Sequence, residues 1–359
     1  MGKSKERLVL FSKQFFGRFR NEIKHVFYFL VYYSGVLYFS ILLWKKVRKK
    51  HEVVILFYHR FIKGKNGENI LPYLDIKEFK KQVAHLNRFY TFISMEDVVR
   101  TLKEDGKFGE PSVLLTIDDG YLSNYVLAYP ILQKYKIPAI IYLTAGLIGT
   151  WKALWVDDIE FALNNSGVTL FSLRELFGDE IMDITTFEKK KKVEKRLFTT
   201  MRKMDTVRRE YLINRLFEIL RLDPSELKKR ARTMLNWEEV AEMAKNGVSF
   251  GAHTLSHAFL PVLAGEIAKT EIRESKEIIE KRIGKPIRHF AIPNGKSEDF
   301  TEELLEFCGN IGFDTIVTTE SGVVNSTSSL FSLKRVPPST PLYCFACEIA
   351  KYLMFCKRG

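Results

Sequence analysis

The sequence predicts an α/β protein with a mostly parallel sheet, either open or closed into a barrel. Continuous apolar runs, at 53–58, 113–117 and 139–144, are typical of strands that are buried on both faces. Amphipathic helical patterns separate these runs and favour crossover helices outside the sheet. With 46% apolar and 28% charged residues, the 359-residue chain has the composition of a globular protein, which argues against disorder.

Before residue 150 the apolar runs alternate regularly with helical patterns. The stretch 76–89 predicts a helix because Phe79, Val83 and Leu86 recur on one face. The elements expected in this part are strand 53–58, helix 76–89, a helix from Met95, strand 113–117, helix 123–135 and strand 139–144.

Residues 150–232 interrupt the alternation. Their second half is rich in Lys, Arg and Glu, and a helical stripe is expected from Val207, Tyr211, Leu216 and Leu220. We interpret 150–232 as a helical insertion packed over the sheet, in which the lysine run 189–192 forms a solvated face.

The α/β alternation resumes at Trp237. The expected elements are helix 238–245, strand 248–252, helix 266–283 stopped by Gly284 and Pro286, strands 287–292 and 315–319, and an apolar core helix at 343–355. The predicted organisation is a basic N-terminal segment 1–50, a domain 51–340 containing the insertion, and a C-terminal helix within 341–359.

The basic charge of the chain is concentrated at its N-terminus. Residues 1–50 contain twelve Lys/Arg and two Asp/Glu, a net charge of +10, so that only +3 of the total of +13 remains for residues 51–359. A basic arm before a nearly neutral domain argues against a nucleic-acid groove across the fold. It favours contact between residues 1–50 and an anionic membrane surface.

Within this arm, residues 26–44 carry no charge and predict an apolar helix long enough to cross a bilayer. Tyr28, Tyr32 and Tyr38 share one face with Gly35, as a helix lying flat in the interface would require. Membrane association is therefore expected, with a spanning and an in-plane helix both open and the side of the membrane undecided.

Two sequence motifs together indicate a metal site. Asp118 and Asp119 follow the apolar run 113–117, and adjacent carboxylates are costly unless a cation offsets their repulsion. Read alone, the pair fits better an Asp-Gly turn with a capping Asp. His253 and His257 follow the run 248–252, and two imidazoles with one carboxylate leave a fourth position open, as a catalytic zinc site requires.

The chain resembles the polysaccharide deacetylases, the NodB-homology or carbohydrate esterase family 4 group. The resemblance is carried by Thr116–Gly120 with Tyr121, by Phe250–His257, by Ile283–Pro286 and by Phe290–Gly295. The opening 55–60 is similar to the branch that includes exopolysaccharide deacetylases. The resemblance implies a distorted (β/α)7 TIM-like barrel, a divalent metal (zinc, with Co, Ni or Mn as alternatives), and hydrolysis of N-acetyl groups on amino sugars of a polysaccharide or glycolipid.

Carried over by position, the resemblance makes Asp119, His253 and His257 the metal ligands and Asp118 the general base. It places the oxyanion and substrate loop at Pro293, Asn294 and Gly295, and makes His59 the candidate general acid, with a packed strand-end histidine as the alternative. The chain departs from the family pattern where Ala291 replaces an Arg that orients the base; neither Arg288 nor Arg60 aligns with that position.

Two other functions remain open from the sequence. One is a hydrolase with the same metal site that acts on a different C–N or ester bond. The other is a catalytically silent, membrane-tethered module that binds glycans.

Overall fold

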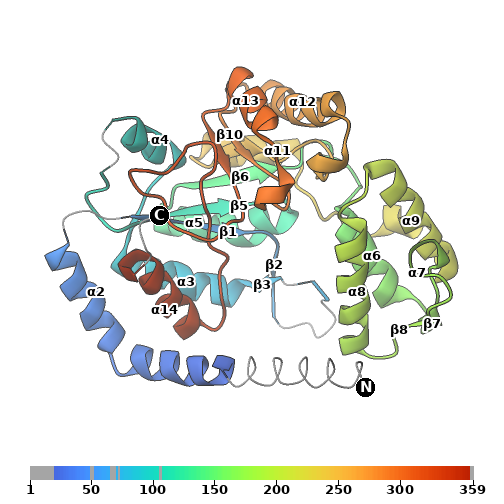
Figure 1. Cartoon of the computed structure of the whole chain (residues 1–359), viewed down its shortest axis with the longest axis horizontal. Coiled ribbons are helices and arrows are strands. Elements are labelled where there is room, and N and C mark those ends of the chain that lie inside the picture. Colours follow the sequence, from blue (N-terminus) through green and yellow to red (C-terminus); the bar gives the residue numbers. More distant parts are fainter. Residues whose placement is uncertain (1–19, 49–51, 65–69, 72, 105–106, 356–359) are drawn as a thin grey trace, which may run out of the picture.

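The computed structural model describes residues 20–48, 52–64, 70–71, 73–104 and 107–355 (Figure 1). Residues 1–19 of the predicted basic segment and the last four residues of the chain lie outside these ranges. The described part is an α/β fold around one curled parallel sheet, which confirms the predicted class.

Six parallel strands follow one another across the sheet, and all their carboxyl ends therefore lie at the same edge. Their order is β1 (Val53–Tyr58), β5 (Ser112–Ile117), β6 (Ala139–Leu143), β9 (Ser249–Ala252), β10 (His289–Ala291) and β11 (Thr315–Val317). Three short strands accompany them: β4 (Thr91–Phe92) pairs with β5, and β2 (Phe61–Ile62) pairs with β3 (Leu74–Asp75).

An extended segment, 333–336, connects the two end strands of the sheet. The Leu333 N–H donates to Ile316 O of β11 at 2.9 Å, and the Val336 N–H donates to Ile55 O of β1 at 2.8 Å. Single parallel bridges join this segment to both strands. The arrangement is a distorted barrel of six strands, in which residues 333–336 occupy the position where the resemblance implied a seventh strand.

Helices cover the outside of the barrel, as the amphipathic patterns predicted. They are α3 (Ile76–Phe89), α4 (Met95–Glu104), α5 (Tyr129–Tyr135), α11 (Trp237–Lys245), α12 (Gly265–Ile283), α13 (Glu302–Asn310) and α14 (Leu342–Phe355). In α3, Phe79, Val83 and Leu86 are fully buried. The apolar face of α14 is also buried, and this helix packs against α3 and β1.

The insertion forms a helical lobe beside the barrel with its own apolar core (Figure 1). Its elements are α6 (Trp155–Asn165), β7 (Leu170–Phe171), α7 (Arg174–Phe177), β8 (Met182–Asp183), α8 (Phe187–Met201), α9 (Thr206–Ile219) and α10 (Glu226–Lys229). The antiparallel pair β7–β8 was not predicted. The predicted stripe was also partly wrong, because Val207 and Tyr211 are exposed and α9 instead buries Leu212 and Ile213 with Leu216.

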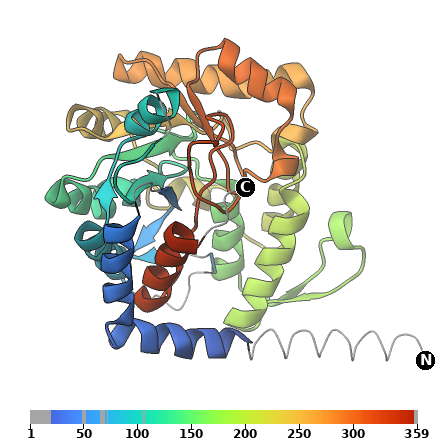
Figure 2. The ribbon, with the colours of Figure 1, turned by 60° about the vertical axis from the view of Figure 1, so that its left-hand side comes forward.

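The predicted apolar helix 26–44 is broken in two (Figure 2). The helix Arg20–Tyr33 and α2 (Val36–Val47) meet at an angle of 71°. Gly35 permits the bend because its φ is +80°, in the region that only glycine enters readily. Among the described residues no single helix is long and apolar enough to cross a membrane, although this bent pair meets the criterion when both halves are counted.

Candidate metal centre and active site

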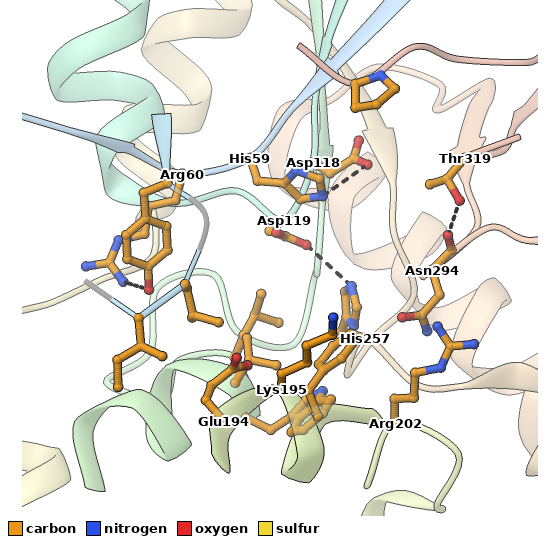
Figure 3. Close-up of a pocket in the computed structure, with 18 of the residues that line it drawn as sticks. His59, Arg60, Asp118, Asp119, Glu194, Lys195, Arg202, His257, Asn294 and Thr319 are labelled. Carbon is orange, nitrogen blue, oxygen red and sulfur yellow. Dashed lines mark hydrogen bonds and ion pairs between the residues drawn. The ribbon is translucent and has the colours of Figure 1, made fainter. Parts of the chain in front are cut away.

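The candidate residues come together at the carboxyl edge of the sheet. His59 follows β1, Asp118 and Asp119 follow β5, His253 follows β9, and Asn294 lies just beyond β10. All five line one pocket, which His257 also borders (Figure 3). Strands that are far apart in the sequence therefore bring both predicted motifs to one place, as parallel pairing requires.

A tight turn positions the two aspartates. Asp119 and Gly120 both have positive φ, +77° and +84°, a conformation that Asp tolerates better than most residues. A Cβ at Gly120 would lie 2.8 Å from the Leu143 side chain. The Asp-Gly turn considered for this dipeptide is therefore real, and it belongs to the site.

Asp119, His253 and His257 form a cluster that could hold a metal ion. Their ligand atoms lie within 4.8 Å of one another. The Nε2 atoms of both imidazoles are 3.5 Å from Asp119 Oδ1. Asp119 is buried, and its Oδ1 has no hydrogen-bond partner among the described residues.

The charges of this cluster fit a cation. Burial lowers the pKa of His253 to about 4, and burial together with the His253 and Arg209 charges holds the pKa of His257 well below its usual value. Both imidazoles are therefore neutral and able to ligate. Burial and the Asp118 charge raise the pKa of Asp119 well above its usual value. A divalent cation would relieve this penalty, and two nitrogens with one oxygen are a zinc-type donor set.

Contacts outside the cluster orient the two histidines. His253 Nδ1 donates to Ala291 O at 2.7 Å, which leaves Nε2 free to face Asp119. Glu271 of α12 fixes the turn between the histidines: its carboxylate accepts from the Leu255 and Ser256 N–H groups, each at 2.9 Å, and from Ser256 Oγ at 2.7 Å.

Asp118 is held by Arg335, which lies in the segment 333–336. The guanidinium donates to both carboxylate oxygens, with Nη1 2.7 Å from Oδ1 and Nη2 2.8 Å from Oδ2. Arg335 is fully buried and also donates to Thr318 O and Thr116 Oγ1. Burial alone would raise the pKa of Asp118, but Arg335 and the nearby His253 lower it to about 2. Asp118 is therefore an ionised base beside the cluster.

His59 lies beside Asp118 in the pocket (Figure 3). Its Nε2 is 3.9 Å from Asp118 Oδ2, and 47% of its side chain is exposed. Desolvation and the Arg335 charge lower the pKa of His59 more than the Asp118 carboxylate raises it. Asn124 donates to His59 O at 2.7 Å and so fixes the backbone at this strand end. The imidazole is thus accessible from the pocket, unlike a histidine packed at a strand end.

The predicted loop 293–295 forms a turn at the edge of the pocket. Asn294, with φ of +62°, lines the pocket, and its carbonyl accepts a hydrogen bond from the Thr319 hydroxyl (Figure 3). The Gly295 N–H donates to Pro293 O at 2.8 Å. A Cβ at Gly295 would lie 2.8 Å from Thr319 N, so that only glycine allows the two loops to approach this closely.

The pocket over the site has a volume of about 860 Å³. The barrel provides its floor, with the cluster and Asn294, while α8 provides one wall through Glu194, Lys195 and Phe198 (Figure 3). The insertion was predicted to pack over the barrel; its lobe lies beside the barrel, and its helix α8 borders the pocket.

Sequence reasoning missed Arg335 and Glu271. The base-orienting Arg was sought near Ala291, where the family pattern has it, but the guanidinium comes from a segment 217 residues after Asp118. No local motif marks either residue. Arg335 directly follows Lys334, and Glu271 lies in a helical stretch rich in charged residues, so that the sequence alone singles out neither of them.

Sequence comparisons identify a matching family and similar proteins. The sequence profile of the family described as polysaccharide deacetylase matches residues 105–171 and 179–313, more than half of the chain. YxkH of Bacillus subtilis (strain 168), a protein named as a polysaccharide deacetylase, is 22% identical over 294 residues, 82% of this chain and 74% of YxkH. The poly-beta-1,6-N-acetyl-D-glucosamine N-deacetylase of Staphylococcus aureus (strain MSSA476) is 34% identical over 117 residues, 29% of this chain and 40% of that protein.

Two solved structures share the fold. IcaB from Ammonifex degensii has a TM-score of 0.55 and 19% identity, over 84% of this chain and 98% of that chain. The Streptococcus pyogenes deacetylase PplD, solved in complex with acetate, has a TM-score of 0.53 and 20% identity, over 80% of this chain and 92% of that chain.

Proposed function

Because the chain belongs to the polysaccharide deacetylase family and is a hydrolase of carbon–nitrogen bonds, we propose that it removes N-acetyl groups from amino sugars and releases acetate. One observation carries the proposal: a buried Asp-His-His cluster lies beside a second aspartate that Arg335 keeps ionised, in a pocket large enough for a sugar.

Asp119, His253 and His257 would hold a divalent cation. When bound, such an ion polarises the acetamide carbonyl and lowers the pKa of a water molecule towards neutrality. Zinc suits two neutral imidazoles and one carboxylate, and cobalt, nickel or manganese could occupy the same donors.

Asp118 accepts the proton of the attacking water, whose oxygen adds to the acetamide carbon. Arg335 fixes both carboxylate oxygens, so that Asp118 stays ionised and correctly oriented. The C–N bond then breaks. The proton that Asp118 took from the water passes to His59, whose Nε2 lies 3.9 Å from Asp118 Oδ2, and His59 delivers it to the leaving amine nitrogen. The loop at Asn294, with its flanking Pro293 and Gly295, contributes a backbone N–H to the developing oxyanion.

We also propose that residues 1–50 bind an anionic membrane surface and tether the deacetylase domain there. Residues 20–48, the described part of this segment, support the proposal. The outward side chains of the helix pair are large and apolar, with Phe27 60% and Phe39 69% exposed, and Lys45 and Lys46 follow at the end of α2.

Acetate release tests the proposed reaction. The full-length chain, loaded with zinc, is expected to release acetate from an N-acetylated β-1,6-linked glucosamine oligomer. Asp118→Asn is expected to lower kcat by at least about 10²-fold, because the general base is lost. Glu188→Gln, an exposed carboxylate of the same pocket, is the matched control and should retain activity.

The same assay separates the two alternatives. A chain that hydrolyses a simple aryl acetate but no N-acetylated sugar would be a hydrolase for another bond. Zinc-loaded protein that binds the oligomer, releases no acetate and binds equally well as Asp118→Asn would be a silent glycan-binding module.

A further inference from the structure

The pocket extends well beyond the space that one acetamide needs. It follows α8, because Arg202, Lys195 and Glu188 all line it. At the rise of an α-helix, the span from residue 202 to residue 188 corresponds to about 20 Å. One end of the pocket therefore lies at the metal cluster, and the other lies where α8 begins.

Much of the wall along this path is apolar. Leu71, Leu154, Trp155, Val156, Phe198 and Ile292 all line the pocket. Sugar hydroxyls would find no hydrogen-bond partners on these apolar surfaces. A hydrocarbon chain, in contrast, would gain about 25 cal/mol for each Å² of apolar area buried there. The pocket is thus suited to a ligand with an apolar part next to its sugar.

Three lysines stand on the same wall, between the metal cluster and the beginning of α8. Lys191, Lys192 and Lys195 are exposed side chains that line the pocket. Glu188 and Glu194 share this wall, but Glu194 is buried and burial raises its pKa to about 7, which weakens its opposition to an anion. Ammonium groups in this position can bind phosphate oxygens.

The N-terminal helix pair presents an apolar surface at the same end of the molecule. Its inner face is fixed to the domain: Lys24 pairs with Glu348 at 2.6 Å, and Leu37 and Ile41 are buried. Its outer face exposes Val26, Phe27, Leu30, Tyr33, Phe39 and Leu43, each by 59% or more. The helix Arg20–Tyr33 thus turns apolar side chains outward, as interfacial helices do, and α2 rises from its end at an angle of 71°.

Figures 1 and 2 relate this surface to the pocket. The two views share the vertical direction, and in both the beginning of α8 lies near the level of the helix Arg20–Tyr33, at the lower side of the molecule. In Figure 1, β7 and β8 also lie at this side, where Leu170 is 55% exposed. A lipid surface against the helix Arg20–Tyr33 would therefore lie close to the outer end of the pocket.

We propose that the substrate of this chain is a membrane-embedded glycolipid, in which a phosphate or diphosphate joins an N-acetylated amino sugar to a lipid chain. The sugar reaches the metal cluster, the phosphate lies against Lys191, Lys192 and Lys195, and the lipid runs along the apolar wall towards the bilayer. The inference rests on the deacetylase function proposed above, and the deacetylation leaves the phosphate link intact.

The test compares two substrates of the zinc-loaded, full-length chain. One is a polyprenyl diphosphate carrying N-acetylglucosamine, presented in vesicles of phosphatidylcholine with anionic phosphatidylglycerol. The other is the soluble β-1,6-linked N-acetylglucosamine oligomer. We expect kcat/KM to be at least about 10-fold higher for the vesicle substrate, because burial of the lipid and pairing of the phosphate both add binding.

Substitutions test the two contacts separately. A triple variant, Lys191→Gln with Lys192→Gln and Lys195→Gln, is expected to lower the vesicle-to-oligomer ratio of kcat/KM about 10-fold through KM. Lys245→Gln with Lys281→Gln and Lys285→Gln removes the same charge from exposed positions away from the pocket and should keep the ratio. Phe27→Ser with Phe39→Ser is expected to lower both vesicle co-sedimentation and the ratio.

The outcomes distinguish a failure of this inference from a failure of the proposed deacetylase function. If the oligomer is hydrolysed as efficiently as the vesicle substrate, and neither the lysine nor the phenylalanine variant changes the ratio, the substrate is a soluble glycan and the inference is overturned. If neither substrate releases acetate, the proposed deacetylase function fails as well.

Discussion

Asp118 and Asp119 are neighbours in the chain, and both are almost fully buried, with 1% and 3% of their surface exposed. Their surroundings shift their pKa values in opposite directions. Asp118 meets a guanidinium that binds both its oxygens, and its pKa is lowered to about 2. Asp119 meets two neutral imidazoles, one of its oxygens has no partner among the described residues, and its pKa is raised well above the usual value.

This difference divides the site into two halves. The half around Asp118 is complete within the protein, because a fixed positive charge compensates the buried carboxylate. The half around Asp119 has the metal-ligand atoms, but among the described residues no cationic side chain binds its carboxylate, so that a bound cation would provide the compensation. One half therefore suits a resident base and the other a bound cation.

The largest effect is expected from removing the charge that completes the Asp118 half. Arg335→Met should lower the free energy of unfolding by about 3–5 kcal/mol, because it leaves an unpaired buried carboxylate. Acetate release should fall at least about 10²-fold, since the base loses its orientation. Urea unfolding and a kinetic assay measure both quantities.

Two controls accompany Arg335→Met. Arg100→Met, which removes an exposed arginine from a surface ion pair, should cost less than about 1 kcal/mol. Adding Asp118→Asn to Arg335→Met should restore much of the stability without restoring activity. Equal losses for Arg100→Met and Arg335→Met would contradict the importance of the buried pair.

The second prediction concerns the Asp119 half. After chelation, adding zinc at about 1,000 times its dissociation constant should stabilise the wild-type chain by about 4 kcal/mol. Asp119→Asn should abolish this gain while leaving the metal-free protein at least as stable as wild type, because a disfavoured carboxylate is removed. Thermal unfolding with and without zinc measures the difference. A full zinc response in Asp119→Asn would exclude Asp119 as a ligand.

Glu194 is a buried carboxylate that is not part of the Asp119, His253 and His257 cluster, and its pKa is also raised. It therefore shows the effect of burial on a carboxylate apart from metal binding. Burial and the Glu160 charge raise it from 4.5 to about 7, against the opposing charges of Lys191 and Lys195. The folded state therefore binds a proton more tightly than the unfolded state. The resulting contribution to stability is complete below pH 4.5 and is lost as the pH rises through 7.

Glu194→Gln should accordingly be more stable than wild type at pH 9 by at most about 3 kcal/mol, and nearly equal to it at pH 4.5. Urea unfolding at a series of pH values measures the difference, and the zinc response should remain that of wild type. A stability difference that does not vary with pH would show that the pKa of Glu194 is the same in the folded and unfolded states.

The strands and four of the site residues could be predicted from the sequence, because each depends on a short continuous segment of the chain. The apolar runs predicted the parallel strands, and the motifs directly after them supplied Asp118, Asp119, His253 and His257, because a strand end carries its next residues to the sheet edge. Arg335 and Glu271 escaped prediction because they act across the fold. Only packing brings segment 333–336 beside β1, and only the position of α12 brings its carboxylate to the histidine turn.

The smallest expected effect concerns Glu271, which acts on the Asp119 half without touching the proposed cation. Its carboxylate accepts three hydrogen bonds from the turn between His253 and His257. Glu271→Gln keeps one oxygen acceptor for the two N–H groups but loses the negative charge that strengthens these hydrogen bonds, and should cost about 2 kcal/mol of stability. Zinc affinity should fall about 10–100-fold, because the His257 ring loses its fixed position.

A zinc titration of the chelated protein measures the affinity directly, without reference to activity. Glu274→Gln, an exposed carboxylate three residues further along α12, should leave it unchanged. If Glu271→Gln lowers stability but binds zinc as tightly as wild type, the turn holds His257 without this clamp. The geometry of the Asp119 half would then not depend on Glu271. The two halves would differ only in that Asp118 is paired with a cationic side chain of the described chain and Asp119 is not.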